Sequence, residues 1–315
     1  SVQIPQTMAG VHLAPELGLN LQNKHRIWLG FDGLHEWGSD EKIRSLDPVL
    51  YYEYAGKPFR FYAGAFPRQL ALDKYPRMFF QDSITNYRPL LNGIFWELKV
   101  NGNYANVWLD WASRQTDKRR EAFFMGWSGR YNRKPFYMQH FGYMFHFAKT
   151  KGREKPEPLH DNGLILTSFG LDLASGSPFE KLEVNAGWSA GLERNREIGV
   201  WNTPHGLLSE LKVEYKGLGL FNTYYKGGSQ QVFRNDYGAE LYWGDPVYRA
   251  KEYDRLDFHI HFIKTGAVRL TFQYSLHLME RQMYHEQSFY AVFDLDNLKN
   301  SKKEKKYSYL WDNWF

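Results

Sequence analysis

The feature that most constrains this chain is an alternation of apolar and polar residues that recurs along its whole length. In the segment 255–263, Leu256 and Phe258 flank Asp257, and the segment 268–278 repeats the pattern. Side chains of a β-strand point alternately to its two faces, so each such segment has one apolar and one polar face. Because no segment shows a convincing helical period, the sequence predicts an all-β protein.

The composition narrows the class of protein further. The chain has 315 residues, no cysteine, 11 Trp, 22 Tyr and 23 Phe. The lack of cysteine excludes a disulfide scaffold and a cysteine-ligated metal, and the aromatic content excludes disorder. A net charge of +5, with no dominant basic block before the C-terminus, makes nucleic acid an unsuitable partner. The start, Ser1 to Pro5, lacks the pattern of a signal peptide, which fits either a cytosolic protein or a mature exported chain.

Two architectures use this many amphipathic strands. In a soluble sandwich, such as a carbohydrate-binding domain, the apolar faces turn inward; in a membrane barrel they face lipid and the polar faces line a lumen. Long strands such as 135–149 and 178–193, Tyr and Trp at strand ends, and alternating short and long connections favour the barrel. The short connection at 115–118 is an exception. We therefore predict a transmembrane antiparallel up-and-down β-barrel.

Fifteen candidate strands can be marked, the last of them at 287–296. Because single-chain bacterial barrels have an even number of strands, we predict about 16 of them, with about 14 as the alternative. The whole chain, 1–315, is expected to be one barrel domain with large loops at 69–90 and 228–250. The basic and aromatic segment 297–315 is either the last strand or a periplasmic tail.

Two stretches resemble known barrels. Residues 59–68, a long connection and a strand that opens with Asn92-Gly93 are similar to a recurring porin pattern, and the aromatic run ending at Phe315 is similar to the C-terminal signature of outer-membrane barrels. The chain thus resembles the Gram-negative outer-membrane β-barrels, broadly the porin-like family. The resemblance implies an outer-membrane location with the signal peptide removed, and a loop at 69–90 that folds into the lumen and constricts it.

On this basis we expect a channel for passive passage of small polar solutes or ions, with no enzymatic activity, no cofactor and no metal. Opposed acidic and basic groups in a constriction would sort solutes by charge, although the same groups could instead pair and seal the lumen. The polar faces supply the pore-lining candidates Arg60, Tyr62, Glu97, Lys99, Asp110, Glu183, Arg255, Asp257 and Arg269. The loop supplies the constriction candidates Asp73, Lys74, Arg77, Asp82 and Arg88.

One alternative is a non-conducting barrel subunit of a larger outer-membrane complex, which binds partner proteins through its loops. Large aromatic and arginine side chains suit such binding, and they give the partner-loop candidates Phe233, Arg234, Tyr237, Trp243 and Tyr248. The expected partners are outer-membrane lipids, including lipopolysaccharide, and other outer-membrane or periplasmic proteins.

Another alternative is a lipid-modifying enzyme of the lipase or acyltransferase type. Ser275 and His277 lie two residues apart on one polar face, and His259 and His261 lie on the neighbouring predicted strand. Serine and histidine are the groups of nucleophilic hydrolysis, but a triad is recognised by geometry rather than by spacing.

Overall fold

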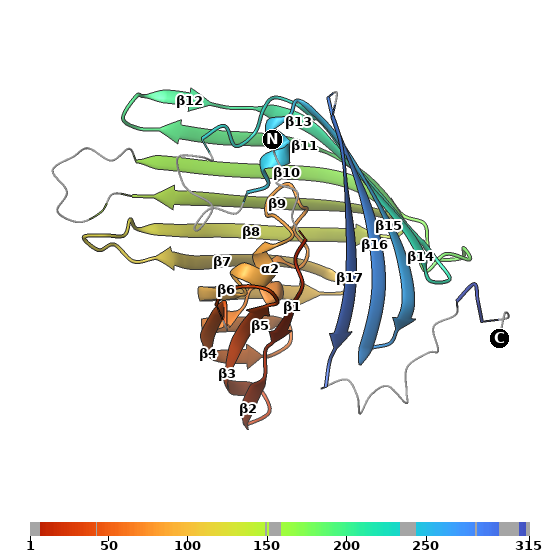
Figure 1. Ribbon diagram of the computed structural model, residues 1–315, viewed down its shortest axis with the longest axis horizontal. Coiled ribbons are helices and arrows are strands. Elements are labelled where there is room, and N and C mark those ends of the chain that lie inside the picture. The colour runs from red at the N-terminus through yellow and green to blue at the C-terminus, as the bar shows by residue number, and fades with distance from the viewer. Residues whose placement is uncertain are drawn as a thin grey trace.

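The computed structural model (Figure 1) describes residues 7–41, 43–148, 150, 159–233, 244–280, 282–295 and 309–312. In these ranges the fold is one antiparallel sheet of 17 strands. The helices are short, and within the described part of the chain none has the length and apolarity needed to cross a bilayer.

The first nine strands are β1 (Gly10–Leu13), β2 (Glu16–Leu21), β3 (His25–Glu36), β4 (Ser45–Ala55), β5 (Phe59–Pro67), β6 (Leu90–Val100), β7 (Asn103–Ser113), β8 (Ala122–Arg133) and β9 (Phe136–Phe147). The remaining strands are β10 (His160–Asp172), β11 (Lys181–Asn195), β12 (Val200–Asn202), β13 (His205–Tyr215), β14 (Leu218–Gly227), β15 (Glu252–Lys264), β16 (Val268–Met279) and β17 (Gln282–Phe293). The helical segments are α1 (Gln69–Leu72), α2 (Ile84–Tyr87) and the 3-10 turn η1 (Pro246–Arg249).

The strands form fifteen rows, because β1 and β2 both pair with β3, and β12 and β13 both pair with β11. From β3 onward each row pairs antiparallel with the next, as far as β17. Figure 1 shows the sheet curling, so that β15 to β17 run steeply across the direction of β7 to β12. The predicted all-β, up-and-down antiparallel architecture is confirmed, with a row number close to the expected sixteen.

Short and long connections alternate, which gives the sheet two distinct ends. At the turn end, Asn101 and Gly102 have positive φ values of 50° and 79° and close the β6–β7 hairpin, as a tight two-residue turn requires. At the opposite end, which we call the loop end, the segments 69–90 and 228–250 begin. At the loop end, the connection between β16 and β17 consists only of residues 280–281 and is therefore much shorter than the 69–90 and 228–250 segments.

One set of large apolar side chains points away from the lumen. Phe169 and Trp188 are 66% and 59% exposed, whereas the neighbouring Ser168 and Ser189 are completely buried. Large exposed apolar side chains on one face and buried polar ones on the other are the arrangement of a barrel that stands in lipid.

The hydrophobic core lies inside the barrel, against the wall formed by β4 to β9. Phe66, Phe95, Trp108 and Phe145 are among its largest fully buried side chains, and residues of the 69–90 segment pack against the same cluster. Full burial of side chains of this kind stabilises a fold by about 1.5–3 kcal/mol each.

The described residues of the C-terminal segment, 309–312, form a turn rather than a strand. The hydroxyl of Tyr309 accepts a hydrogen bond from the main-chain N of Lys264 at 2.6 Å, which places this piece at the turn end. The rest of 297–315 lies outside the described residues.

Candidate active site in the barrel lumen

Arg68 fixes the 69–90 loop where it enters the lumen. The residue is 3% exposed, and its Nη1 lies 2.7 Å from Oδ2 of Asp110 on β7. Its Nε and Nη2 donate to the main-chain oxygens of Arg88 and Leu90, both at 2.7 Å. One guanidinium therefore ties both ends of the loop to the wall, which directs the middle of the loop inward.

The middle of the loop fills part of the lumen with apolar side chains. Met78 and Phe79 are completely buried. The Tyr75 hydroxyl accepts a hydrogen bond from Nε1 of Trp108 at 2.9 Å and donates one to the oxygen of Trp127 at 2.8 Å. Burial raises the pKa of the Tyr75 hydroxyl above its ordinary value. This part of the lumen is packed like a protein core rather than like an aqueous pore.

Two charged residues of the same loop reach the opposite wall. Arg77 forms an ion pair with Asp257 on β15 and another with Asp82, where Nε lies 2.9 Å from Oδ1. Arg255, also on β15, contacts the same two carboxylates at 2.8 Å and 3.0 Å. Arg255 and Asp257 are buried and Arg77 and Asp82 are more exposed. Buried charges persist only when paired, and these two guanidinium and two carboxylate groups balance one another.

Ser275 on β16 belongs to this network. It lies directly opposite Asp257 in the β15–β16 ladder, and its Oγ donates to Oδ1 of Asp257 at 2.5 Å. Nε2 of Gln273 donates to the same Oγ at 2.8 Å. The hydroxyl is therefore held in a defined position on the inner face of the barrel.

His277 lies beside Ser275 on the same face. Its Nδ1 is 2.8 Å from the hydroxyl of Tyr253, and its Nε2 is 3.8 Å from Oε2 of Glu286 on β17. The side chain is almost completely buried, and among the described residues Nε2 has no hydrogen-bond partner. A hydrogen bond at one ring nitrogen fixes the orientation of a histidine, which leaves Nε2 able to take up a proton.

These residues form what we call the lumen cluster: Arg77, Asp82, Tyr253, Arg255, Asp257, Gln273, Ser275, His277 and Glu286. The cluster lies close to the loop end, since His277 is two residues from the end of β16 at Met279. A hydroxyl, an imidazole with a free nitrogen, and guanidinium groups are the components of ester hydrolysis. In the described ranges, no group of three or more His, Asp or Glu side chains could hold a metal ion.

Comparison with known families identifies the class of protein. The lipid A 3'-O-deacylase-type family matches residues 1–301. The chain belongs to this family. The expectation that it is not an enzyme is therefore wrong, because the family takes its name from an enzymatic activity.

Solved structures support the fold of this deacylase-type chain. An anion-selective porin from Comamonas acidovorans matches with a TM-score of 0.54 and 10% identity, over 87% of each chain. A loop-deletion mutant of OmpT, an outer membrane protein of Vibrio cholerae, matches with a TM-score of 0.55 and 8% identity, over 90% of each chain. A search of curated proteins gave no significant match. The predicted likeness to Gram-negative outer-membrane barrels is confirmed, and it agrees with an outer-membrane location.

The predicted pore-lining residues fall into two groups in this deacylase-type barrel. Five are buried on the inner face: Tyr62, Glu97, Asp110, Arg255 and Asp257. Four lie nearer the turn end and are exposed or half-buried: Arg60, Lys99, Glu183 and Arg269. The four buried charged members of the first group are paired within the protein, as Asp110 is with Arg68. Their charges are thus balanced by neighbouring side chains, while their assignment as pore-lining residues stays a prediction.

The predicted constriction residues, Asp73, Lys74, Arg77, Asp82 and Arg88, lie on the loop that enters the lumen. Arg77 and Asp82 join the lumen cluster, and Nζ of Lys74 is 3.2 Å from Oε2 of Glu97. Nη2 of Arg88 donates to the oxygen of Ala112 at 3.0 Å. These contacts hold the loop against the walls.

The predicted partner-binding residues are only partly described. Tyr248 is completely buried, and the ring of Phe233 lies 6.0 Å from the ring of His160 against the core. These two side chains therefore pack inside the barrel instead of facing a partner. Arg234, Tyr237 and Trp243 lie outside the described residues.

Sequence reasoning identified Ser275 and His277 but missed Glu286 and Tyr253. Glu286 was missed because the candidate strand 287–296 was expected to begin one residue later, whereas β17 begins at Gln282. The alternation of Tyr284, Glu286 and Ser288 is the signal that could have extended this strand.

The two histidines expected on the neighbouring strand lie outside the cluster. His259 and His261 stack on each other at 6.1 Å between ring centroids, and Nδ1 of His261 is 2.9 Å from Oγ1 of Thr271.

Proposed function

We propose that this chain is an outer-membrane hydrolase that removes the ester-linked acyl chain at the 3' position of lipid A. The observation that carries the proposal is the family match over residues 1–301. The reaction adds water across the ester, so that a fatty acid leaves and the sugar hydroxyl is restored. The lumen cluster supplies side chains suited to each part of this reaction.

Ser275 is the proposed nucleophile and His277 the proposed base. The two side chains share one face of β16, and Nε2 of His277 is free to accept the proton of the hydroxyl. Attack requires Ser275 to exchange its hydrogen bond with Asp257 for one with His277. Glu286, 3.8 Å from Nε2, would then stabilise the imidazolium ion.

The negative charge that develops on the ester oxygen needs positive groups close by. Arg77 and Arg255 are the guanidinium groups nearest to Ser275 in the network, since both contact its partner Asp257. As Ser275 releases Asp257, these two groups remain in place to stabilise an oxyanion.

The position of the cluster suits a lipid substrate. Lipid A occupies the outer leaflet of the outer membrane, and the loop end of a barrel faces that side. His277 lies near this end, next to the short 280–281 connection. The adjacent strand β17 presents strongly exposed apolar side chains, including Met283 and Phe289, which could hold an acyl chain.

The test is mass spectrometry of lipid A after incubation with the purified full-length protein in detergent. We expect loss of one acyl chain at the 3' position, abolished in Ser275→Ala and His277→Gln. Ser209 is a half-buried serine on the outer face of β13. The variant Ser209→Ala is therefore the matched control and should remain active. The electrophoretic shift of the heated barrel reports that each variant is folded.

Two results would contradict different parts of the proposal. If the folded wild-type protein released no acyl chain, the function itself would be refuted. If the wild type were active and both variants kept that activity, the family assignment would stand and the lumen cluster would not be the active site.

A further inference from the structure

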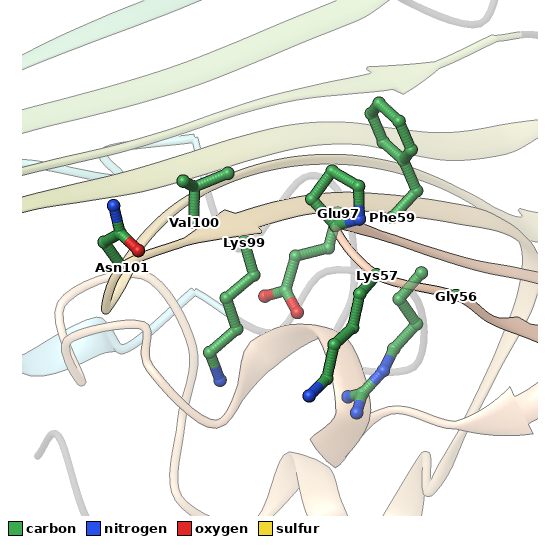
Figure 2. Close-up of a pocket in the computed structure, with 9 residues that line it drawn as sticks. Gly56, Lys57, Phe59, Glu97, Lys99, Val100 and Asn101 are labelled. Atoms are coloured by element: carbon green, nitrogen blue, oxygen red, sulfur yellow. The ribbon is translucent and has the colours of Figure 1, made fainter.

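A cavity of about 500 Å³ lies at the turn end of the barrel, whereas the lumen cluster lies near the loop end. It is formed where β4 and β6 end and β5 begins, and its charged lining residues are Lys57, Arg60, Glu97 and Lys99. We call it the turn-end pocket. Figure 2 shows Lys57, Glu97 and Lys99 projecting to one side of the strands, and Phe59 and Val100 to the other.

The strand alternation explains this arrangement. Arg60 has the same parity as the buried Tyr62, and Lys99 the same parity as the buried Glu97, so both cations belong to the inner face. Phe59 is 41% exposed on the outer face. The pocket is therefore part of the inner mouth of the barrel, and short turns of outer-membrane barrels face the periplasm.

The pocket carries an excess of positive charge. Among the described residues, Lys57, Arg60 and Lys99 form no ion pair. Glu97 is already engaged, because Nζ of Lys74 lies 3.2 Å from its carboxylate. That ammonium also lies 3.9 Å from the centre of the Tyr104 ring, so the Glu97 carboxylate is already neutralised by a cation held in place.

We propose that the turn-end pocket binds a small anion that carries phosphate groups. Cavities of this size hold small molecules, and guanidinium with ammonium groups is the combination that recognises phosphate oxygens. Three unpaired cations in one concave site repel each other, and a polyanion relieves that repulsion. This site is separate from the proposed deacylase site and does not depend on that function.

The probe is sodium pyrophosphate, titrated calorimetrically into the full-length protein in a non-ionic detergent. We expect saturable binding at one site. The double variant Arg60→Gln/Lys99→Gln should weaken the affinity at least tenfold, which is about 1.4 kcal/mol. Lys24→Gln, in the β2–β3 turn at the same end, is the control and should bind as the wild type does.

Competition separates the two sources of phosphate. Vesicles of phosphatidylcholine with phosphatidylglycerol that displace pyrophosphate indicate a lipid headgroup, and vesicles that do not displace it indicate a soluble ligand; both outcomes support the site. Absence of saturable pyrophosphate binding by the folded wild type, or an equal loss in Lys24→Gln, would overturn it. Lipid A deacylation by the double variant should be unchanged, which keeps this test independent of the active site.

Discussion

Replacing Arg68 by methionine should release the loop that fills the lumen. Methionine keeps much of the buried volume but removes the charge and all three contacts of the guanidinium. Those contacts are the ion pair with Asp110 at 2.7 Å and the two hydrogen bonds to the oxygens of Arg88 and Leu90. The substitution leaves a carboxylate on β7 that is 1% exposed and has lost its cation.

The magnitude follows from the burial of both partners. Removing one member of a buried ion pair costs about 3–5 kcal/mol, because the other charge stays desolvated. The main-chain N of Asn92 still donates to Oδ1 of Asp110 at 3.0 Å, so part of the carboxylate remains satisfied. We therefore expect a loss of about 3 kcal/mol in the free energy of unfolding, at the lower end of that range.

Urea unfolding of the purified barrel in lipid vesicles, followed by tryptophan fluorescence, measures this loss. Arg26→Met is the matched control, since Arg26 is partly exposed and lies 3.5 Å from Glu53; its loss should be below about 1 kcal/mol. Adding Asp110→Asn to Arg68→Met should recover part of the stability, because the orphaned charge is gone. If Arg68→Met were as stable as the control, the claim that this ion pair anchors the loop would be refuted.

Three further predictions concern the same interior. Phe79→Ala should lower the free energy of unfolding by about 3–5 kcal/mol in the same urea assay, against a smaller loss for the partly exposed Leu70→Ala. Burial raises the pKa of Asp245 to about 6, so the folded state holds its proton more tightly than the unfolded state and stability should fall as pH rises from about 4 to about 6. Asp245→Asn should remove this slope in urea titrations across that range; an unchanged slope would contradict it. In planar bilayers the wild type should show no stepwise conductance, and regular steps would contradict the packed lumen.

The architecture could be predicted from the sequence because lipid-facing and lumen-facing residues alternate along each strand of a membrane barrel. Alternation around Asp257 and Ser275 fixed which face each residue occupies, and the ladder of β15 and β16 has that arrangement. The short helices α1 and α2 could not be predicted, since four residues are too few to show a helical period. They are shaped by packing inside the lumen rather than by local preference.

Only some of the active-site candidates could be predicted from the sequence. Ser275 and His277 are visible as a pair because they are near in sequence and share one face. Their partners Glu286 and Asp257 come from other strands, and their approach depends on register, which a one-residue slip would reverse. Arg77 arrives from a loop, across the lumen, and no local pattern in the sequence specifies that contact.

The expectation of an open channel did not take account of a pattern that the sequence contains. A pore needs polar inner faces on all its strands, but β9 is apolar on both faces: Phe141 and Phe145 point inward and are buried, while Met138 and Met144 point outward. Contact with lipid explains only the apolar side chains that point outward. An inner aromatic set needs a partner inside the barrel, and the 69–90 loop supplies Phe79 to it. Two-faced apolar strands beside a long aromatic loop therefore predict a lumen that is at least partly filled.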